Sequence, residues 1–213
     1  KEVRGNVTHL VENDSKILHL DMHDLWIDAK QPNRLLLGND GGIFTSFDKG
    51  KEWVHHNTLP IAEFYTISVD HHDTNIVYGG TQDNNSLGGP SRTINTRGII
   101  NEDWYVTNGG DGFESQIDPN NPDIVYAQSQ YGFLVRYDKK SGEIVGIQPK
   151  ERENENAYRF NWDSPLSVSK HAPGRLYFAA NKVFRSNDYG NSWEVLSDDL
   201  SQQIDRNKLK VYD

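Results

Sequence analysis

The sequence predicts an all-β fold built from repeated units. Four segments align without a gap, and each holds a turn followed by β-branched and aromatic residues. No apolar pattern with a 3.6-residue period is sustained, and only the polar tail SDDLSQQIDRNKLK looks modestly helical. We therefore expect short strands through most of the 213 residues.

The repeats have the length of propeller blades. Their anchor positions follow one another at steps of 42, 48 and 51 residues and are Asp28, Asp70, Asp118 and Ser169. Repeats of about 40 to 50 residues with several short strands are typical of propellers, which have about four to eight blades. The pattern predicts a β-propeller with four recognisable blades, either as one domain spanning residues 1–213 or as part of a larger propeller.

Within a repeat, a turn separates the first two strands. The stretch DPNNP at 118–122 concentrates residues that preset turns, and IVYA follows it at 124–127 as a strand. A glycine-bearing connection and a third apolar strand come next in three repeats, at residues 42–45, 132–135 and 183–185.

The spacing Ser-x-Asp-x-Gly-x-x-Trp occurs twice after the third strand. In each copy the carboxylate can accept turn N–H groups, the glycine tolerates positive φ and the tryptophan returns to the core. We interpret these residues as a structural turn staple: Ser46, Asp48, Gly50, Trp53, Ser186, Asp188, Gly190 and Trp193. Calcium binding is the weaker alternative, because Ca²⁺ takes about six or more oxygen ligands.

Composition argues against several classes of partner. Acidic residues number 31 against 22 basic ones, and no Lys/Arg cluster suited to phosphates occurs, so we expect no nucleic acid partner. Apolar runs are only a few residues long, which predicts no membrane span. Without cysteine there is no disulfide or Cys-based metal site, and the start at Lys1 suggests a processed protein or a fragment.

The paired turn segments resemble the Asp-box, or bacterial neuraminidase repeat, signature. Stretches including HDLWIDAKQPNRLLLGNDGG, NGGDGFESQIDPNNPDIVYAQSQYG and NKVFRSNDYGNSWEVLSDDL look like secreted bacterial proteins described as sortilin-like or glycosyl-hydrolase-like propellers. The resemblance spans about residues 23 to 200. It implies a secreted, periplasmic or cell-surface location, and a longer parent protein that supplies further blades.

Four polar residues lie at equivalent points of the repeats, about twelve residues past the anchors. Pseudo-symmetry would bring them to one face, where propellers place ligands. They are Asp40, Gln82, Gln130 and Asn181. The alternative is that turns simply favour such residues.

Three aspartates are candidate catalysts. Asp40 lies in an Asp-Gly-Gly connection that is similar to, but one residue shorter than, the one holding a catalytic aspartate in xyloglucanase-type hydrolases. Asp83 and Asp111 lie among Gly and Asn residues that suit exposed loops. Glycoside hydrolysis needs two carboxyl groups about 5 to 9.5 Å apart. The alternative for each is a turn aspartate beside glycine.

Several loop residues could contact a ligand. Rings can stack on sugars or anchor a protein, and an arginine can pair with a carboxylate or bridge two blades. The candidates are Trp104, Tyr131 and Arg159, whereas core packing is favoured for Trp162 and a buried, hydrogen-bonded role for His23.

Three functions fit these observations. The first is a binding module for a glycan or protein ligand, which needs no catalytic motif. The second is a glycoside hydrolase that uses the paired aspartates. The third is a structural module of a larger extracellular assembly, whose open edges pair with another chain. The sequence indicates no cofactor and no metal, and leaves open whether the protein is an enzyme.

Overall fold

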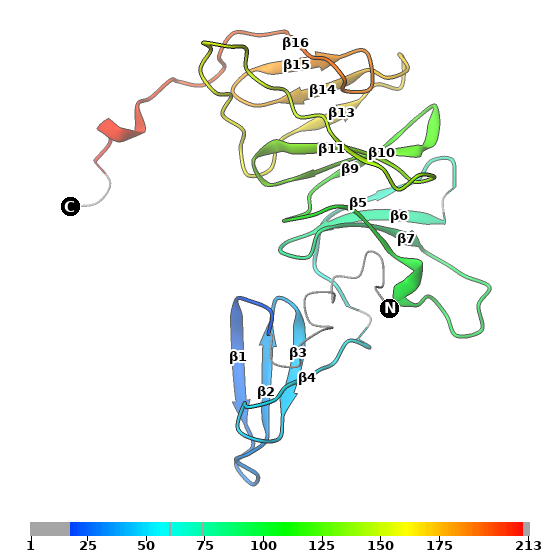
Figure 1. Cartoon of the computed structure of the whole chain (residues 1–213), viewed down its shortest axis with the longest axis vertical. Coiled ribbons are helices and arrows are strands. Elements are labelled where there is room, and N and C mark those ends of the chain that lie inside the picture. The colour runs from blue at the N-terminus through cyan, green and yellow to red at the C-terminus, as the bar shows by residue number, and fades with distance from the viewer. Residues whose placement is uncertain (1–17, 60, 74, 211–213) are drawn as a thin grey trace.

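The computed structural model of the chain describes residues 18–59, 61–73 and 75–210. These residues form four four-stranded antiparallel sheets that follow one another along the chain (Figure 1). The all-β prediction is therefore confirmed at the level of the sheets. The domain interpretation of residues 1–213 also includes residues outside the described ranges.

Each sheet is an up-and-down meander of consecutive strands. The first sheet contains β1 (Met22–Ile27), β2 (Leu35–Asn39), β3 (Gly42–Ser46) and β4 (Val54–His55). The second contains β5 (Phe64–Val69), β6 (Ile76–Thr81), β7 (Ser86–Pro90) and β8 (Tyr105–Asn108). The third contains β9 (Ser115–Asp118), β10 (Asn121–Ser129), β11 (Phe133–Asp138) and β12 (Ile144–Gly146). The fourth contains β13 (Leu166–Val168), β14 (Leu176–Ala179), β15 (Val183–Ser186) and β16 (Glu194–Val195).

The turn between the first two strands of every sheet is closed by its anchor residue. Asp28 accepts the backbone N–H of Lys30 at 2.9 Å, and Asp118 accepts that of Asn120 at 2.8 Å. Asp70 and Ser169 make the equivalent bond to the residue two positions on. Asp and Ser favour such turns because their short side chains reach their own backbone.

The second to fourth sheets share apolar cores. One cluster joins the third and fourth sheets and contains Tyr126, Leu134, Ile147, Leu166, Leu176 and Phe178. Another joins the second and third sheets through Tyr78, Val125 and Tyr137. Because burial of apolar area is the main favourable contribution to folding, these three sheets form one packed body.

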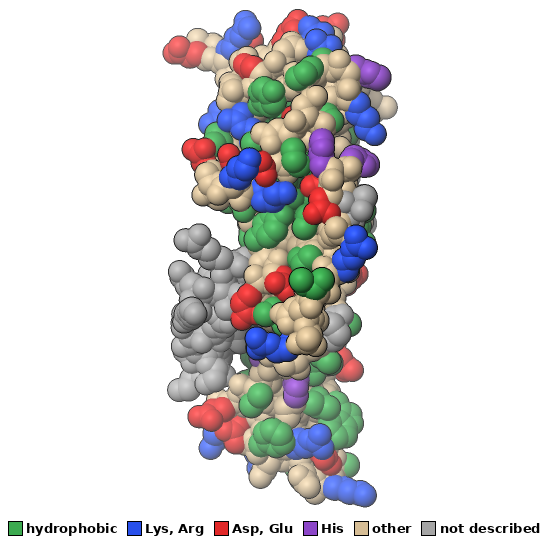
Figure 2. Space-filling view, turned by 90° about the vertical axis from the view of Figure 1, so that its right-hand side faces the viewer, with side chains coloured by type: hydrophobic (Ala, Val, Ile, Leu, Met, Phe, Trp, Pro, Cys, Tyr) green, Lys and Arg blue, Asp and Glu red, His purple; other side chains and the backbone are tan. Residues whose placement is uncertain are grey.

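The first sheet is packed differently. All six residues of β1 are exposed, and neither apolar cluster of the described residues includes a residue of the first sheet. Its strands run along the long axis in Figure 1, whereas those of the other sheets run across it. The exposed apolar residues of β1 include Leu25, Trp26 and Ile27, and green side chains are visible at this end of the molecule in Figure 2.

The staple residues lie where β3 and β15 end. The Asp48 carboxylate accepts the N–H groups of Lys51 and Glu52 at 2.9 and 3.0 Å, and Gly50 has a φ of 85°. In the second copy, Asp188 accepts the N–H of Ser192 at 2.9 Å, and Gly190 again has a φ of 85°. These carboxylates are occupied within their own turns.

In both copies the glycine N–H donates to the hydroxyl of the first serine: Gly50 to Ser46 and Gly190 to Ser186. The tryptophans then differ. The Trp53 indole N–H donates to the carbonyl of Gly50 in the same turn. The Trp193 indole N–H instead donates to the carbonyl of Ile147 at 2.7 Å, and the Trp193 side chain packs on the core of the third and fourth sheets.

The helical expectation for the tail is wrong. Among the described residues, that tail contains only a 3₁₀ turn at Arg206–Lys208, and other 3₁₀ turns lie at Asn101–Asp103 and Gln130–Gly132. An isolated helix of this length is marginal in water, because nucleation is unfavourable without tertiary packing. Within the described ranges, no helix has the length and apolarity needed to cross a bilayer.

Candidate functional site

Three connections meet at the junction of the first and second sheets. They are the β2–β3 turn, the β6–β7 hairpin and the β8–β9 link. The hairpin and the link approach so closely that a Cβ on Gly112 would lie 2.2 Å from the carbonyl oxygen of Asn85. In the hairpin, Asp83 and Asn85 have φ values of 58° and 71°, a conformation that Asp and Asn tolerate better than most residues. Glycine is therefore required in the link, and the hairpin has a defined shape.

Asp111 in the β8–β9 link holds the β6–β7 hairpin in place. It is only 4% exposed, accepts the backbone N–H of Asp83 at 2.8 Å and accepts the Gln130 side-chain amide at 3.0 Å. The expectation that Asp111 lies in an exposed loop is therefore wrong. Its bond to the backbone of Asp83 positions that residue, and its bond to Gln130 connects the β8–β9 link to the third sheet.

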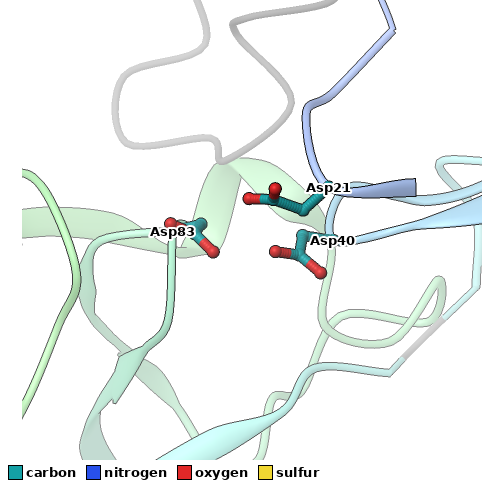
Figure 3. A group of neighbouring side chains, drawn as sticks. All are labelled: Asp21, Asp40 and Asp83. Carbon is teal, nitrogen blue, oxygen red and sulfur yellow. The ribbon is translucent and has the colours of Figure 1, made fainter. Parts of the chain in front are cut away.

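Asp40 and Asp83 face each other across the junction. Asp21, just before β1, and Asp40, just after β2, come from the first sheet, and Asp83 comes from the second (Figure 3). One oxygen of each of the three carboxyl groups lies within 4.8 Å of the others. The Asn84 side chain also donates to the Asp40 carbonyl at 2.8 Å. The sheets are therefore joined here by polar groups.

His23 on β1 completes the cluster. Its imidazole hydrogen-bonds and ion-pairs with the Asp40 carboxylate, and its side chain is 66% exposed. The sequence favoured a buried histidine, which is wrong, because β1 is exposed along its whole length. This contact raises the pKa of His23, and the hydrogen bond from His23 lowers the pKa of Asp40.

Asp83 is the member of the cluster whose pKa is raised. Partial removal from water raises its pKa to about 7, and hydrogen bonds with Asp40 and Asp111, with their negative charges, act in the same direction. The hydrogen bond from His23 favours the ionised form of Asp40, so Asp83 holds a proton more readily than Asp40 does. Two carboxyl groups with opposite pKa shifts can act as a hydrogen-bond donor and an acceptor toward a ligand hydroxyl.

Asp21, Asp40 and Asp83 are the described residues placed to hold a cation. Three such oxygens are fewer than the six to eight that Ca²⁺ usually takes. We therefore assign no metal to them.

A row of aromatic rings leads away from the carboxylates. Tyr65 donates to the side chain of Gln82, beside Asp83, and stacks on Phe113 with ring centroids 5.4 Å apart. Trp162 lies edge-on to Phe113 at 6.5 Å and edge-on to Tyr131 at 5.1 Å. Phe113 is buried, whereas Tyr65, Trp162 and Tyr131 are 43%, 39% and 61% exposed. The row thus presents three accessible rings above a buried one.

Trp162 therefore lies partly at the surface rather than wholly in the core, where the sequence favoured it. It belongs to the segment between β12 and β13, and its carbonyl accepts the backbone N–H of Tyr131 at 3.2 Å. This bond joins the two backbone segments that carry the rings.

The polar positions of the four repeats are not equally placed. Asp40, Gln82 and Gln130 each come directly after the second strand of their sheet and belong to the network described above. Asn181 instead donates to Asp199 at 2.9 Å and accepts the backbone N–H of Arg159. The structure brings three of these residues into one network and gives Asn181 different partners.

Arg159 and Trp104 lie apart from the carboxylates. Arg159 ion-pairs with Asp199 at 2.7 Å, which connects the β12–β13 segment to the chain after β16. Trp104 packs on Gly89, which pairs with Val77 at the far end of the second sheet from the β6–β7 hairpin. Neither residue contributes a described contact to the carboxylate cluster.

Sequence reasoning missed Asp21, Tyr65 and Phe113. Exposure alternates along β5, and Tyr65 occupies one of its exposed positions, so the sequence gives it no sign other than that of an ordinary strand residue. Asp21 has a φ of 56°, which the sequence does not reveal. A signal was available for Phe113, since it follows the Gly-Gly-Asp-Gly run that contains Asp111.

No family model matches the chain, and no curated protein matches it. Solved structures do match it. A GH74 xyloglucanase from Xanthomonas campestris is 16% identical with a TM-score of 0.45, and covers 82% of this chain and 30% of its own. The GH74 enzyme of Niastella koreensis is 14% identical with a TM-score of 0.44, and covers 81% of this chain and 29% of its own.

An extracellular domain of a hybrid two-component system from B. thetaiotaomicron is 11% identical with a TM-score of 0.44. It covers 85% of this chain and 25% of its own. The chain thus spans less than a third of these solved structures. At these scores the likeness carries no argument about the site.

Proposed function

We propose that the chain is part of a β-propeller that binds a glycan on the face formed by the carboxylate cluster and the aromatic row. The row is the observation that carries the proposal. Aromatic faces can cover the apolar faces of sugar rings, and the adjacent carboxyl and amide groups can bond sugar hydroxyls. The exposed rings of Tyr65, Trp162 and Tyr131 are fixed by contacts with one another or with Phe113, so they lose little freedom on binding.

We also propose a longer parent protein and an extracellular location for the chain. We infer that residues 1–213 are one propeller domain or a fragment of one, with further blades supplied by the same parent protein. An extracellular location follows from the Asp-box resemblance. The exposed apolar residues of β1 support further contacts at that edge.

Glycoside hydrolysis is the second candidate, favoured by the split pKa values of Asp83 and Asp40. The spacing argues against it. Catalytic carboxyl groups stand about 5 to 5.5 Å apart in retaining enzymes and about 6.5 to 9.5 Å apart in inverting ones. One carboxyl oxygen of Asp40 lies within 4.8 Å of one of Asp83, which is closer than either of these separations. Binding without cleavage is therefore the function that the geometry supports better.

Calorimetric titration with a panel of neutral oligosaccharides tests the proposal. Trp162→Ala should weaken binding at least about tenfold, which corresponds to ~1.4 kcal/mol. Tyr131→Ala should do the same. Tyr189→Ala is the matched control, because Tyr189 is also an exposed tyrosine with positive φ but lies in the second Asp-box turn.

The outcomes separate the candidates. Equal losses in Tyr131→Ala and Tyr189→Ala, or no saturable binding to any oligosaccharide, would overturn the glycan proposal. New reducing ends in the same mixtures, lost in Asp40→Asn with the fold intact by circular dichroism, would replace binding with hydrolysis. We expect no new reducing ends.

A further inference from the structure

A cavity lies at the end of β5 that is opposite to the carboxylate cluster. It has a volume of about 250 Å³ and lies beside β5, β9 and β13; its walls are formed by Ser68, Val69, His71, Ser115, Gln116, Ile117, Pro119, Val168 and Lys170. Tyr65 and the β6–β7 hairpin lie at the start of β5, whereas Val69 at its end lines the cavity. The cavity is therefore separated from the carboxylate cluster by the length of a strand, about 17 to 20 Å for five or six residues.

The cavity combines apolar walls with the amine of Lys170. Val69, Ile117 and Val168 supply the apolar walls. Among the described residues, the ionisable side chains that line it are those of His71 and Lys170, and no carboxylate does so. Within the described part of the chain, the Lys170 amine has no ion-pair partner. In a protein of net charge -9, this is a local reversal of sign.

The aspartates nearest in sequence are directed elsewhere. Asp70 and Asp118 are fully buried. Asp70 accepts the N–H of His72 at 2.8 Å, and its other oxygen lies 3.9 Å from the Lys139 amine. Asp118 accepts a turn N–H and the Tyr126 hydroxyl at 3.2 Å. Among the described residues, neither aspartate lines the cavity or forms an ion pair with Lys170.

We propose that this cavity binds a small organic carboxylate with an apolar body. The Lys170 amine supplies the charge, and the valine and isoleucine side chains cover the body of the ligand. Ligand pockets for drug-sized molecules begin at about 300 Å³, so a volume of about 250 Å³ suits a small acid. The ligand is a free small molecule, and this site is independent of the proposed glycan face.

Benzoate is a suitable probe and benzamide is its neutral counterpart. Titration of the full chain, followed by chemical shifts of backbone amides, should give saturable benzoate binding with changes concentrated at 68–71, 115–119 and 168–170. Benzamide should bind at least about tenfold more weakly, and Lys170→Gln should reduce benzoate affinity by a similar factor. Lys182→Gln is the control, since Lys182 lies over the Tyr158 ring in the fourth sheet.

Equal affinity for benzoate and benzamide would overturn the proposal, since it would mean that the apolar walls bind alone. Unchanged benzoate binding in Lys170→Gln, or shift changes elsewhere, would overturn it as well. Oligosaccharide binding should remain unchanged in Lys170→Gln. A failure at this cavity is thus distinguishable from a failure of the glycan proposal.

Discussion

The first sheet and the three sheets that follow it have the same strand order but are held by different forces. Phe178 and Tyr126 lie in a core shared by the third and fourth sheets, whereas the described contacts joining the first sheet to the second are polar and include Asp40, Asp83 and Asn84. Apolar packing changes little with pH, but a contact between carboxyl groups depends on which one holds a proton. The interfaces between these similar sheets are therefore insensitive to pH where they are apolar, and they depend on pH where carboxyl groups meet.

The largest expected effect comes from removing a ring of the shared core. Phe178 is 1% exposed and contacts Phe160 and Trp193 with ring centroids 5.6 and 6.3 Å apart. Phe178→Ala should lower the free energy of unfolding by about 3 to 5 kcal/mol, measured by urea denaturation. Trp26→Ala on the exposed β1 should cost less than about 1 kcal/mol. Similar losses in both variants would contradict the comparison.

A smaller effect is expected from the proton on Asp83. Because its pKa is raised to about 7 from 3.8, the folded protein binds an extra proton between these values. Stability should therefore fall as pH rises through this window, on the order of 1 kcal/mol after solvent screening. The raised pKa of His23 adds a loss in the same direction at higher pH, since its contribution is complete only below its unfolded pKa of about 6.5.

Asp83→Asn should remove most of this slope, as measured by urea unfolding at several pH values. Asp138→Asn is the control, because turn N–H groups lower the pKa of Asp138, so its contribution is lost below this window. If Asp83→Asn keeps the wild-type slope, the proton does not reside on Asp83.

An effect of similar or smaller size concerns one hydrogen bond at the junction. Asn84→Ala removes the 2.8 Å bond to the Asp40 carbonyl, which should cost about 0.5 to 1.5 kcal/mol. Hydrogen exchange of β3 amides should become faster while that of β14 amides stays unchanged. Asn187→Ala loses a bond within the fourth sheet, so it should leave β3 unaffected. Faster exchange in β14 for Asn84→Ala would mean that the two regions are not independent.

The sequence predicted what is local. The strands follow from β-branched runs, and the anchor turns follow from Asp or Ser at a fixed position, because both depend on neighbours a few residues apart. The pairing of Asp40 with Asp83 or Asp111 was suggested only by the resemblance to xyloglucanase-type hydrolases and by the glycine-rich surroundings of these residues. Asp111 was misjudged because Gly and Asp usually indicate an exposed loop. Here the Asp83 N–H and the Gln130 amide satisfy its charge, which makes burial tolerable.

The anchor turns have a consequence for how such chains change. Asp28, Asp70 and Asp118 each accept the backbone N–H of the residue two positions on, so these turn bonds lie within a single sheet. A first hairpin therefore brings the bonds of its own turn with it when its sheet is duplicated, whereas a contact such as that between Asp70 and Lys139 depends on the neighbouring sheet. The repeated sheets thus share the same local turn, and they differ in the contacts made where two sheets meet.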